Sequence, residues 1–128
     1  MHSQQEFEKH AGTLAKQMIE ADFVHPPSLT ALAQASGLSP YQMSRLFYRV
    51  NHTTIPHYIR KLRTDQAEEL LRTTNRAVGQ VAAEVGYMSM SAFCRAFVRE
   101  KGRLPSDMRR ATAWPAAAAA AATAASAA

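Results

Sequence analysis

Residues 32–50 read LAQASGLSPYQMSRLFYRV, and residues 81–99 read VAAEVGYMSMSAFCRAFVR. The second stretch repeats the first, with an offset of 49 residues up to the glycine and of 50 residues after it. Each copy carries a glycine, a serine and an Arg-x-Phe-x-Arg run in the same order. Glycine permits a sharp bend and serine is a good helix N-cap, so each copy predicts a short helix, a turn and a capped second helix. This is the pattern of a helix-turn-helix, and it occurs twice.

The rest of the sequence also favours helices, because apolar residues recur every three or four positions and almost nowhere alternate. Helices are expected at about residues 7–25, 29–36, 40–50, 54–74, 78–85 and 90–101, with a last short one from residue 105. The predicted fold is all-α, with about seven helices that form two helix-turn-helix lobes joined by a long central helix. The expected divisions are an N-terminal helix and first lobe in 1–54, a linker helix in 55–75, a second lobe in 76–112 and an Ala-rich low-complexity tail in 113–128.

Charge is concentrated in the middle of the chain. The formal net charge is +5 at pH 7. Residues 1–35 carry two basic and four acidic side chains, whereas residues 36–110 carry 13 basic and six acidic ones, a net charge of +7. A positive field of this kind favours a polyanionic partner such as nucleic acid, although a solvated helical face would also account for part of it.

The single cysteine, Cys94, excludes an internal disulfide framework and any metal site built on several thiolates, and it fits a reducing cytosol. No stretch resembles a secretory signal or a membrane span, so a cytoplasmic protein without a membrane partner is expected. The five histidines fall in no metal-ligand spacing, and no glycine-rich phosphate loop is present. Neither a metal nor a cofactor is therefore expected, and enzyme activity has little support.

The second helix of each copy is predicted to have one packed face and one free face. A guanidinium can donate two hydrogen bonds to guanine O6 and N7 or pair with a phosphate, so Arg45 and Arg95 on the free faces are candidates for either contact. A salt bridge or a solvated surface position is the alternative for each arginine. A central helix of about 19 residues spans about 28 Å, close to the ~34 Å of one DNA turn, so one molecule could face two grooves without dimerising.

Several short motifs support a resemblance to a known family. They are SGLS at 36–39, SRLF at 44–47, IRKLR at 59–63, AxxLL at 67–71, VAxxVGY at 81–87, FxRxF at 93–97 and GxxPxxMR at 102–109. Because it carries these motifs, the chain over about residues 7–110 resembles the DNA-binding domain of the AraC/XylS family of bacterial transcription regulators. In length it resembles the stand-alone, MarA/SoxS-like members of that family. The resemblance implies a monomer that binds an asymmetric site in double-stranded DNA through two adjacent major grooves, contacts RNA polymerase, acts as an activator and associates with the nucleoid.

The resemblance also implies which side chains contact DNA. Those expected to read bases are Tyr41, Gln42, Ser44, Arg45, Met90, Ser91, Cys94 and Arg95. Charge and position, independently of the resemblance, mark the side chains expected to contact the DNA backbone. They are Tyr48, Arg49, Arg60, Lys61, Arg63, Arg99 and Lys101. For the three on the central helix, plain surface solvation is the alternative.

Two features depart from the family pattern. His52 stands where the family often has glycine, so the first recognition helix is expected to end differently. Met90 and Cys94 stand at positions that are often polar, so the second recognition helix is expected to rely more on apolar contact, for example with a thymine methyl group.

Two other interpretations remain open. The same fold could act as a protein-interaction adaptor that holds RNA polymerase or another regulator, using the acidic residues Glu6, Glu8 and Glu20 of its first helix. The chain could also be the DNA-binding fragment of a larger effector-responsive regulator. The salt dependence of DNA binding separates a regulator from an adaptor, because several phosphate contacts require a steep negative slope of log affinity against log salt.

Overall fold

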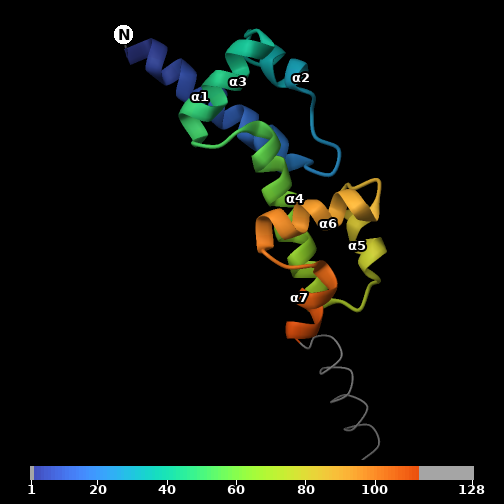
Figure 1. Cartoon of the computed structure of the whole chain (residues 1–128). Helices are drawn as coiled ribbons and strands as arrows, with labels where there is room; N and C mark the ends of the chain where they lie inside the picture. Colours follow the sequence, from blue (N-terminus) through green and yellow to red (C-terminus); the bar gives the residue numbers. More distant parts are fainter. Residues whose placement is uncertain (1, 113–128) are drawn as a thin grey trace, which may run out of the picture. The chain divides into compact units, whose positions relative to one another are not determined.

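The computed structural model describes residues 2–112, and within this part of the chain it contains seven helices and no strand (Figure 1). The helices are α1 (His2–Ala21), α2 (Leu29–Gln34), α3 (Pro40–Asn51), α4 (Ile55–Thr73), α5 (Val78–Glu84), α6 (Met90–Lys101) and α7 (Pro105–Thr112). The prediction of an all-α fold with about seven helices is confirmed. The predicted Ala-rich tail lies outside the described residues.

The helix starts and turns are those that the repeat predicts. Ser39 and Gln42 form a capping box before α3, in which the Ser39 hydroxyl accepts from the Gln42 N–H at 3.1 Å and the Gln42 side chain accepts from the Ser39 N–H at 2.9 Å. Ser89 caps α6 through its hydroxyl alone, which accepts from the Ala92 N–H at 3.1 Å. The turn glycines, Gly37 and Gly86, both have positive φ, 68° and 107°. The two helix-turn-helix units therefore share their local geometry.

The second helices of the two helix-turn-helix units, α3 and α6, also end alike. α6 ends at Gly102, which has a left-handed backbone (φ 80°) and donates its N–H to the Val98 carbonyl at 2.8 Å. α3 ends at His52, which has the same left-handed backbone (φ 60°) and donates to the Tyr48 carbonyl at 2.8 Å. The expectation of a different end for the first recognition helix is wrong, because histidine here adopts the strained conformation that glycine adopts freely.

The chain divides into two compact units, one ending at Leu62 and the other beginning at Arg63, and α4 contributes to both. In the first unit, side chains from α1, α2 and α3 form one buried core that includes Ile19, Leu32 and Phe47. α1 and α3 approach so closely at Gly12 that a Cβ there would lie 2.7 Å from the Cβ of Val50. This contact positions α3 so that its opposite face remains exposed.

The second unit has its own aromatic core. Phe93 and Phe97 of α6 are fully buried, their ring centroids lie 5.7 Å apart, and Leu71 of α4 packs in the same cluster. Arg109 of α7 donates hydrogen bonds to the backbone carbonyls of Leu71 (3.2 Å), Arg76 (2.5 Å) and Thr74 (3.3 Å). Since the last carbonyls of a helix have no partner within it, Arg109 stabilises the C-terminal end of α4.

Candidate nucleic-acid interface

The free face of α3 is exposed as predicted. Its packed face buries Met43, Leu46 and Phe47, whereas the opposite face leaves Tyr41 69% and Tyr48 57% exposed. All the predicted contact residues on α3 are exposed: Tyr41, Gln42, Ser44, Arg45, Tyr48 and Arg49. This face therefore has hydroxyl, amide and guanidinium groups available to a partner outside the unit.

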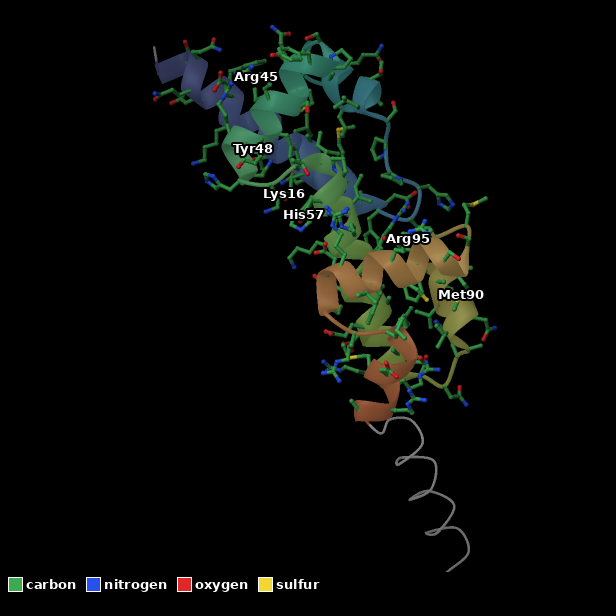
Figure 2. All side chains as sticks on the ribbon, viewed as in Figure 1. Lys16, Arg45, Tyr48, His57, Met90 and Arg95 are labelled. Carbon is green, nitrogen blue, oxygen red and sulfur yellow. The ribbon has the colours of Figure 1, made fainter. Side chains whose placement is uncertain are left out.

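Arg45 and Tyr41 form a pair on this face. The Arg45 Nη1 donates a hydrogen bond to the Tyr41 hydroxyl at 2.7 Å, and its guanidinium carbon lies 5.5 Å from the centroid of the Tyr41 ring. The two residues are four positions apart, which places them on the same side of the helix. A hydrogen bond together with a cation–π contact restricts the arginine side chain before any partner binds. Figure 2 shows the Arg45 and Tyr48 side chains on α3.

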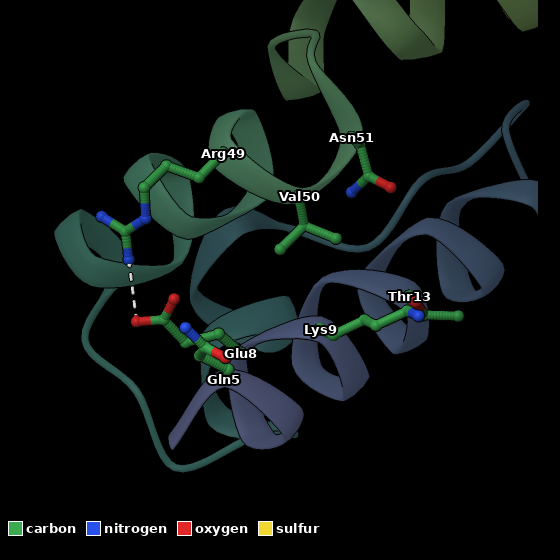
Figure 3. A pocket seen from close by; sticks show the side chains of 7 residues that line it. All are labelled: Gln5, Glu8, Lys9, Thr13, Arg49, Val50 and Asn51. Atoms are coloured by element: carbon green, nitrogen blue, oxygen red, sulfur yellow. Dashed lines mark hydrogen bonds and ion pairs between the residues drawn. The ribbon is translucent and has the colours of Figure 1, made fainter. Parts of the chain in front are cut away.

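Arg49 is engaged by the N-terminal helix. Its Nη2 lies 3.1 Å from the Oε1 of Glu8 on α1, the ion pair drawn in Figure 3. The pair borders an open pocket lined by Gln5, Glu8, Lys9, Thr13, Arg49, Val50 and Asn51. The Arg49 side chain remains 52% exposed, so this is a surface ion pair that water and salt weaken.

The free face of α6 has arginines at the positions equivalent to those on α3, but the residues beside them are more apolar. Met90 and Val98 are 45% and 41% exposed, Arg95 and Arg99 are exposed, and Cys94 is partly covered. Within residues 2–112, no hydrogen bond or ion pair engages the guanidinium of either arginine. Figure 2 shows Met90 and Arg95 on this helix.

An open groove on this face has an almost entirely apolar lining, made by Cys94, Arg95, Val98, Arg99 and Leu104. Val98 is not among the residues that the sequence predicts to contact DNA. Neither is Leu104, which follows the helix and shows no helical periodicity that would mark it.

The predicted backbone-contacting residues outside these two faces differ in their surroundings. Lys61 of α4 is exposed and Arg60 is half-buried. The Arg63 guanidinium carbon lies 5.2 Å from the centroid of the Tyr87 ring, a cation–π contact. The Lys101 Nζ lies 2.5 Å from the Oδ1 of Asp65 and 3.9 Å from the Oε1 of Glu68, and its side chain is only 18% exposed. A phosphate contact from Lys101 would require this ion pair to open.

A third polar cluster connects α1 with α4. The Tyr58 hydroxyl donates a hydrogen bond to the Glu20 carboxylate, and the Lys16 ammonium lies 5.8 Å from the centroid of the Tyr58 ring. Burial, followed by the hydrogen bond and the negative charge of Glu20, raises the pKa of the Tyr58 hydroxyl well above its usual value of 10.0. The cluster joins elements 38 residues apart, and no sequence motif marked it.

Comparison with known proteins identifies the family. The family model described as "Helix-turn-helix domain" matches residues 32–111, which contain both copies of the repeat. Regulatory protein SoxS of Salmonella typhimurium is 38% identical over 91 residues, which make up 71% of this chain and 85% of SoxS. The chain belongs to the AraC/XylS family. This member of the AraC/XylS family is a DNA-binding transcription regulator of the SoxS type.

A solved structure supports the fold assignment of this AraC/XylS-family chain. The C-terminal domain of AraT, a response regulator from Geobacillus stearothermophilus, is 28% identical with a TM-score of 0.73, covering 79% of this chain and 84% of that domain. A second sequence relative is the bifunctional transcriptional activator/DNA repair enzyme AdaA of Bacillus subtilis, which is 31% identical over 97 residues. These residues make up 76% of this chain but only 46% of AdaA, so the similarity covers less than half of that protein.

Neither a metal site nor a membrane helix is found in the described part of this AraC/XylS-family chain. Residues 2–112 contain no group of three His, Cys, Asp or Glu side chains placed to hold a metal ion. Of the helices in the same range, none is both long and apolar enough to cross a bilayer.

Proposed function

We propose that this regulator binds an asymmetric site in duplex DNA as a monomer, placing α3 and α6 in two adjacent major grooves, and activates transcription by contacting RNA polymerase. The observation that carries this proposal is the repetition of exposed arginines at one helical phase, Arg45 and Arg49 on α3 and Arg95 and Arg99 on α6. One chain thus contains two recognition helices, which is what a dimeric helix-turn-helix protein obtains from two subunits.

In this proposal the side chains near the start of each recognition helix read bases. On α3 they are Tyr41, Gln42, Ser44 and Arg45; on α6 they are Met90, Ser91, Cys94 and Arg95. Tyr48, Arg60, Lys61, Arg63 and Arg99 contact phosphates. Arg49 and Lys101 join them only if their ion pairs with Glu8 and Asp65 open. Phosphate contacts supply most of the affinity and base contacts supply the sequence preference. Binding to chromosomal DNA would place the protein on the nucleoid.

The proposal is tested by selecting duplexes from a random-sequence library with the purified chain and then titrating the selected duplex at several salt concentrations. We expect an asymmetric enriched site, one protein per duplex, and a steep negative slope of log affinity against log salt. Arg45→Ala should lower specific affinity more than Arg95→Ala, because the Arg45 guanidinium is already oriented by Tyr41. A slope near zero and no enriched sequence would instead support a protein-interaction adaptor.

Activation is a separate step and needs a separate measurement. Transcription in vitro from a promoter carrying the selected site, with purified RNA polymerase, should rise when the regulator is added. Loss of transcript would indicate repression at that promoter, and no change would contradict a productive contact with RNA polymerase.

A further inference from the structure

The groove on α6 differs in chemistry from the rest of the predicted interface. Cys94, Val98 and Leu104 give it an apolar floor, and Val98 and Leu104 are 41% and 44% exposed. Arg95 and Arg99 line the same groove with the carbon atoms of their side chains, and no acidic residue lines it. Both arginines are exposed to solvent beside it. A ligand that fits this groove therefore has an apolar group flanked by negative charge.

The repeat shows that this apolar character is specific to the second copy. The offset of 50 residues pairs the two groove arginines with Arg45 and Arg49, so the cationic positions are the same in both copies. It pairs Cys94, Val98 and Leu104 with Ser44, Tyr48 and Thr54. Each of the three apolar positions thus corresponds to a hydroxyl-bearing residue in the first copy. A hydroxyl can donate and accept hydrogen bonds, whereas Val and Leu side chains cannot and a thiol does so weakly.

Duplex DNA offers one ligand with the required chemistry. Thymine is the only standard base that presents an apolar group, its C5-methyl, in the major groove, and phosphates border the groove on both sides. Cys94 and Val98 lie four residues apart on the face that carries Arg95, so all three can approach the same few base pairs.

We propose that the groove formed by Cys94, Val98 and Leu104 is a binding site for thymine C5-methyl groups, so that the second recognition helix reads methyls while the first reads hydrogen-bonding edges. This inference rests on the proposed function, because it assigns a ligand to one part of the DNA-binding surface. Arg95 at the base edges and Arg99 at the phosphates hold the duplex in place beside the methyl groups, and the side-chain contacts in the groove select thymine over cytosine.

The experiment uses the full chain and the duplex selected from the random library. Each thymine is replaced in turn by deoxyuridine, which removes the C5-methyl and leaves the base-pairing and hydrogen-bonding groups unchanged. At one or more adjacent thymines, we expect this replacement to weaken binding about fourfold, which is the loss expected when one buried methyl group is removed.

The double variant Cys94→Ser with Val98→Thr replaces the apolar surface with hydroxyls of nearly the same size. It should bind the thymine duplex several-fold more weakly and lose the distinction between thymine and deoxyuridine at those positions. The matched control is Ser44→Ala with Tyr48→Phe, which removes hydroxyls at the equivalent places on α3. It should retain the full methyl dependence.

The outcomes separate this inference from the proposed function. If the library yields a specific site but no thymine in it shows methyl dependence in the unaltered protein, the inference is overturned and the proposed function stands. If the double variant keeps the same methyl dependence, the groove does not contact thymine and an apolar protein segment becomes its remaining occupant, which also overturns the inference. If no sequence is enriched, the proposed function itself fails, and this inference with it.

Discussion

The Arg49 guanidinium on α3 forms an ion pair with the Glu8 carboxylate on α1, with Nη2 and Oε1 3.1 Å apart. The equivalent residue on α6, Arg99, has no such partner within the described residues. The N-terminal helix therefore neutralises one cation of the first recognition helix and leaves its counterpart in the second available.

We expect Glu8→Gln to strengthen DNA binding, because it releases Arg49 to pair with a phosphate. Affinity should rise about two- to fivefold at low salt, and the slope of log affinity against log salt should become more negative by about 0.9. Glu6→Gln is the matched control, since Glu6 is an exposed carboxylate on the same helix with no contact to Arg49. Equal changes in the two variants would show that net charge alone matters and that the ion pair does not.

Tyr41→Phe should lower specific affinity about two- to threefold, because the ring remains and the hydrogen bond that orients the Arg45 guanidinium is lost. Tyr48→Phe is the contrasting variant: it removes an exposed hydroxyl that is expected to contact DNA directly, so its effect should persist in Arg45→Ala. The two changes are compared by titration with the selected duplex, in the unaltered chain and in Arg45→Ala. A Tyr41→Phe effect that persists without Arg45 would mean that the hydroxyl contacts DNA directly.

His52→Gly should raise the free energy of unfolding by about 0.5–1 kcal/mol, because glycine adopts the left-handed conformation at the α3 terminus without the steric cost that histidine pays. Gly102→Ala should have the opposite effect at the end of α6, where φ is 80°. Urea unfolding followed by circular dichroism measures both. A destabilising His52→Gly would indicate that the imidazole makes a stabilising contact.

Gly12→Ala should destabilise the first unit by about 1–2 kcal/mol, since the new Cβ would lie 2.7 Å from the Cβ of Val50 and force α1 away from α3. Val50→Gly removes the Cβ that the new methyl group would meet, so the double variant should lose less stability than the sum of the two single losses. Simple addition of the two losses would mean that the close approach of the helices is not the cause.

The free energy of unfolding should fall at alkaline pH because the Tyr58 hydroxyl loses its proton there. Its pKa is raised in the folded state, so the folded protein holds the proton more tightly than the unfolded chain does. The contribution of Tyr58 to stability is therefore complete below pH 10 and decreases as pH rises above 10. Tyr58→Phe should show a shallower alkaline decrease in the free energy of unfolding than the unaltered protein.

The elements of this fold could be predicted from sequence because their signals are local. Ser39 and Gln42 mark the start of α3 within four residues, and Gly102 marks the end of α6. The end of α3 at His52 was predicted wrongly because residue preference argues against a left-handed backbone, which His52 nevertheless adopts with its N–H bonded to the Tyr48 carbonyl. The strain of about 1–2 kcal/mol that this conformation costs is small beside the burial of the Phe47 side chain and its neighbours.

The partners of the predicted contact residues could not be read from the sequence. Arg49 and Glu8 are separated by 41 residues, and Lys101 and Asp65 by 36. Helical periodicity shows which face of its own helix a cation occupies, but it does not show which carboxylate of another helix that face meets. The sequence therefore predicted exposed cations at both sites, and the tertiary structure pairs them.

The exposed arginines and serine of α6 can change during evolution without unfolding the protein. Ser91, Arg95 and Arg99 face solvent, and no hydrogen bond or ion pair within residues 2–112 depends on their functional groups. Replacing them alters the folding free energy by less than about 0.5 kcal/mol. If α6 reads bases as proposed, mutation can redirect half of the DNA sequence preference one amino acid at a time, and a duplicated gene can acquire new promoters while its product still folds.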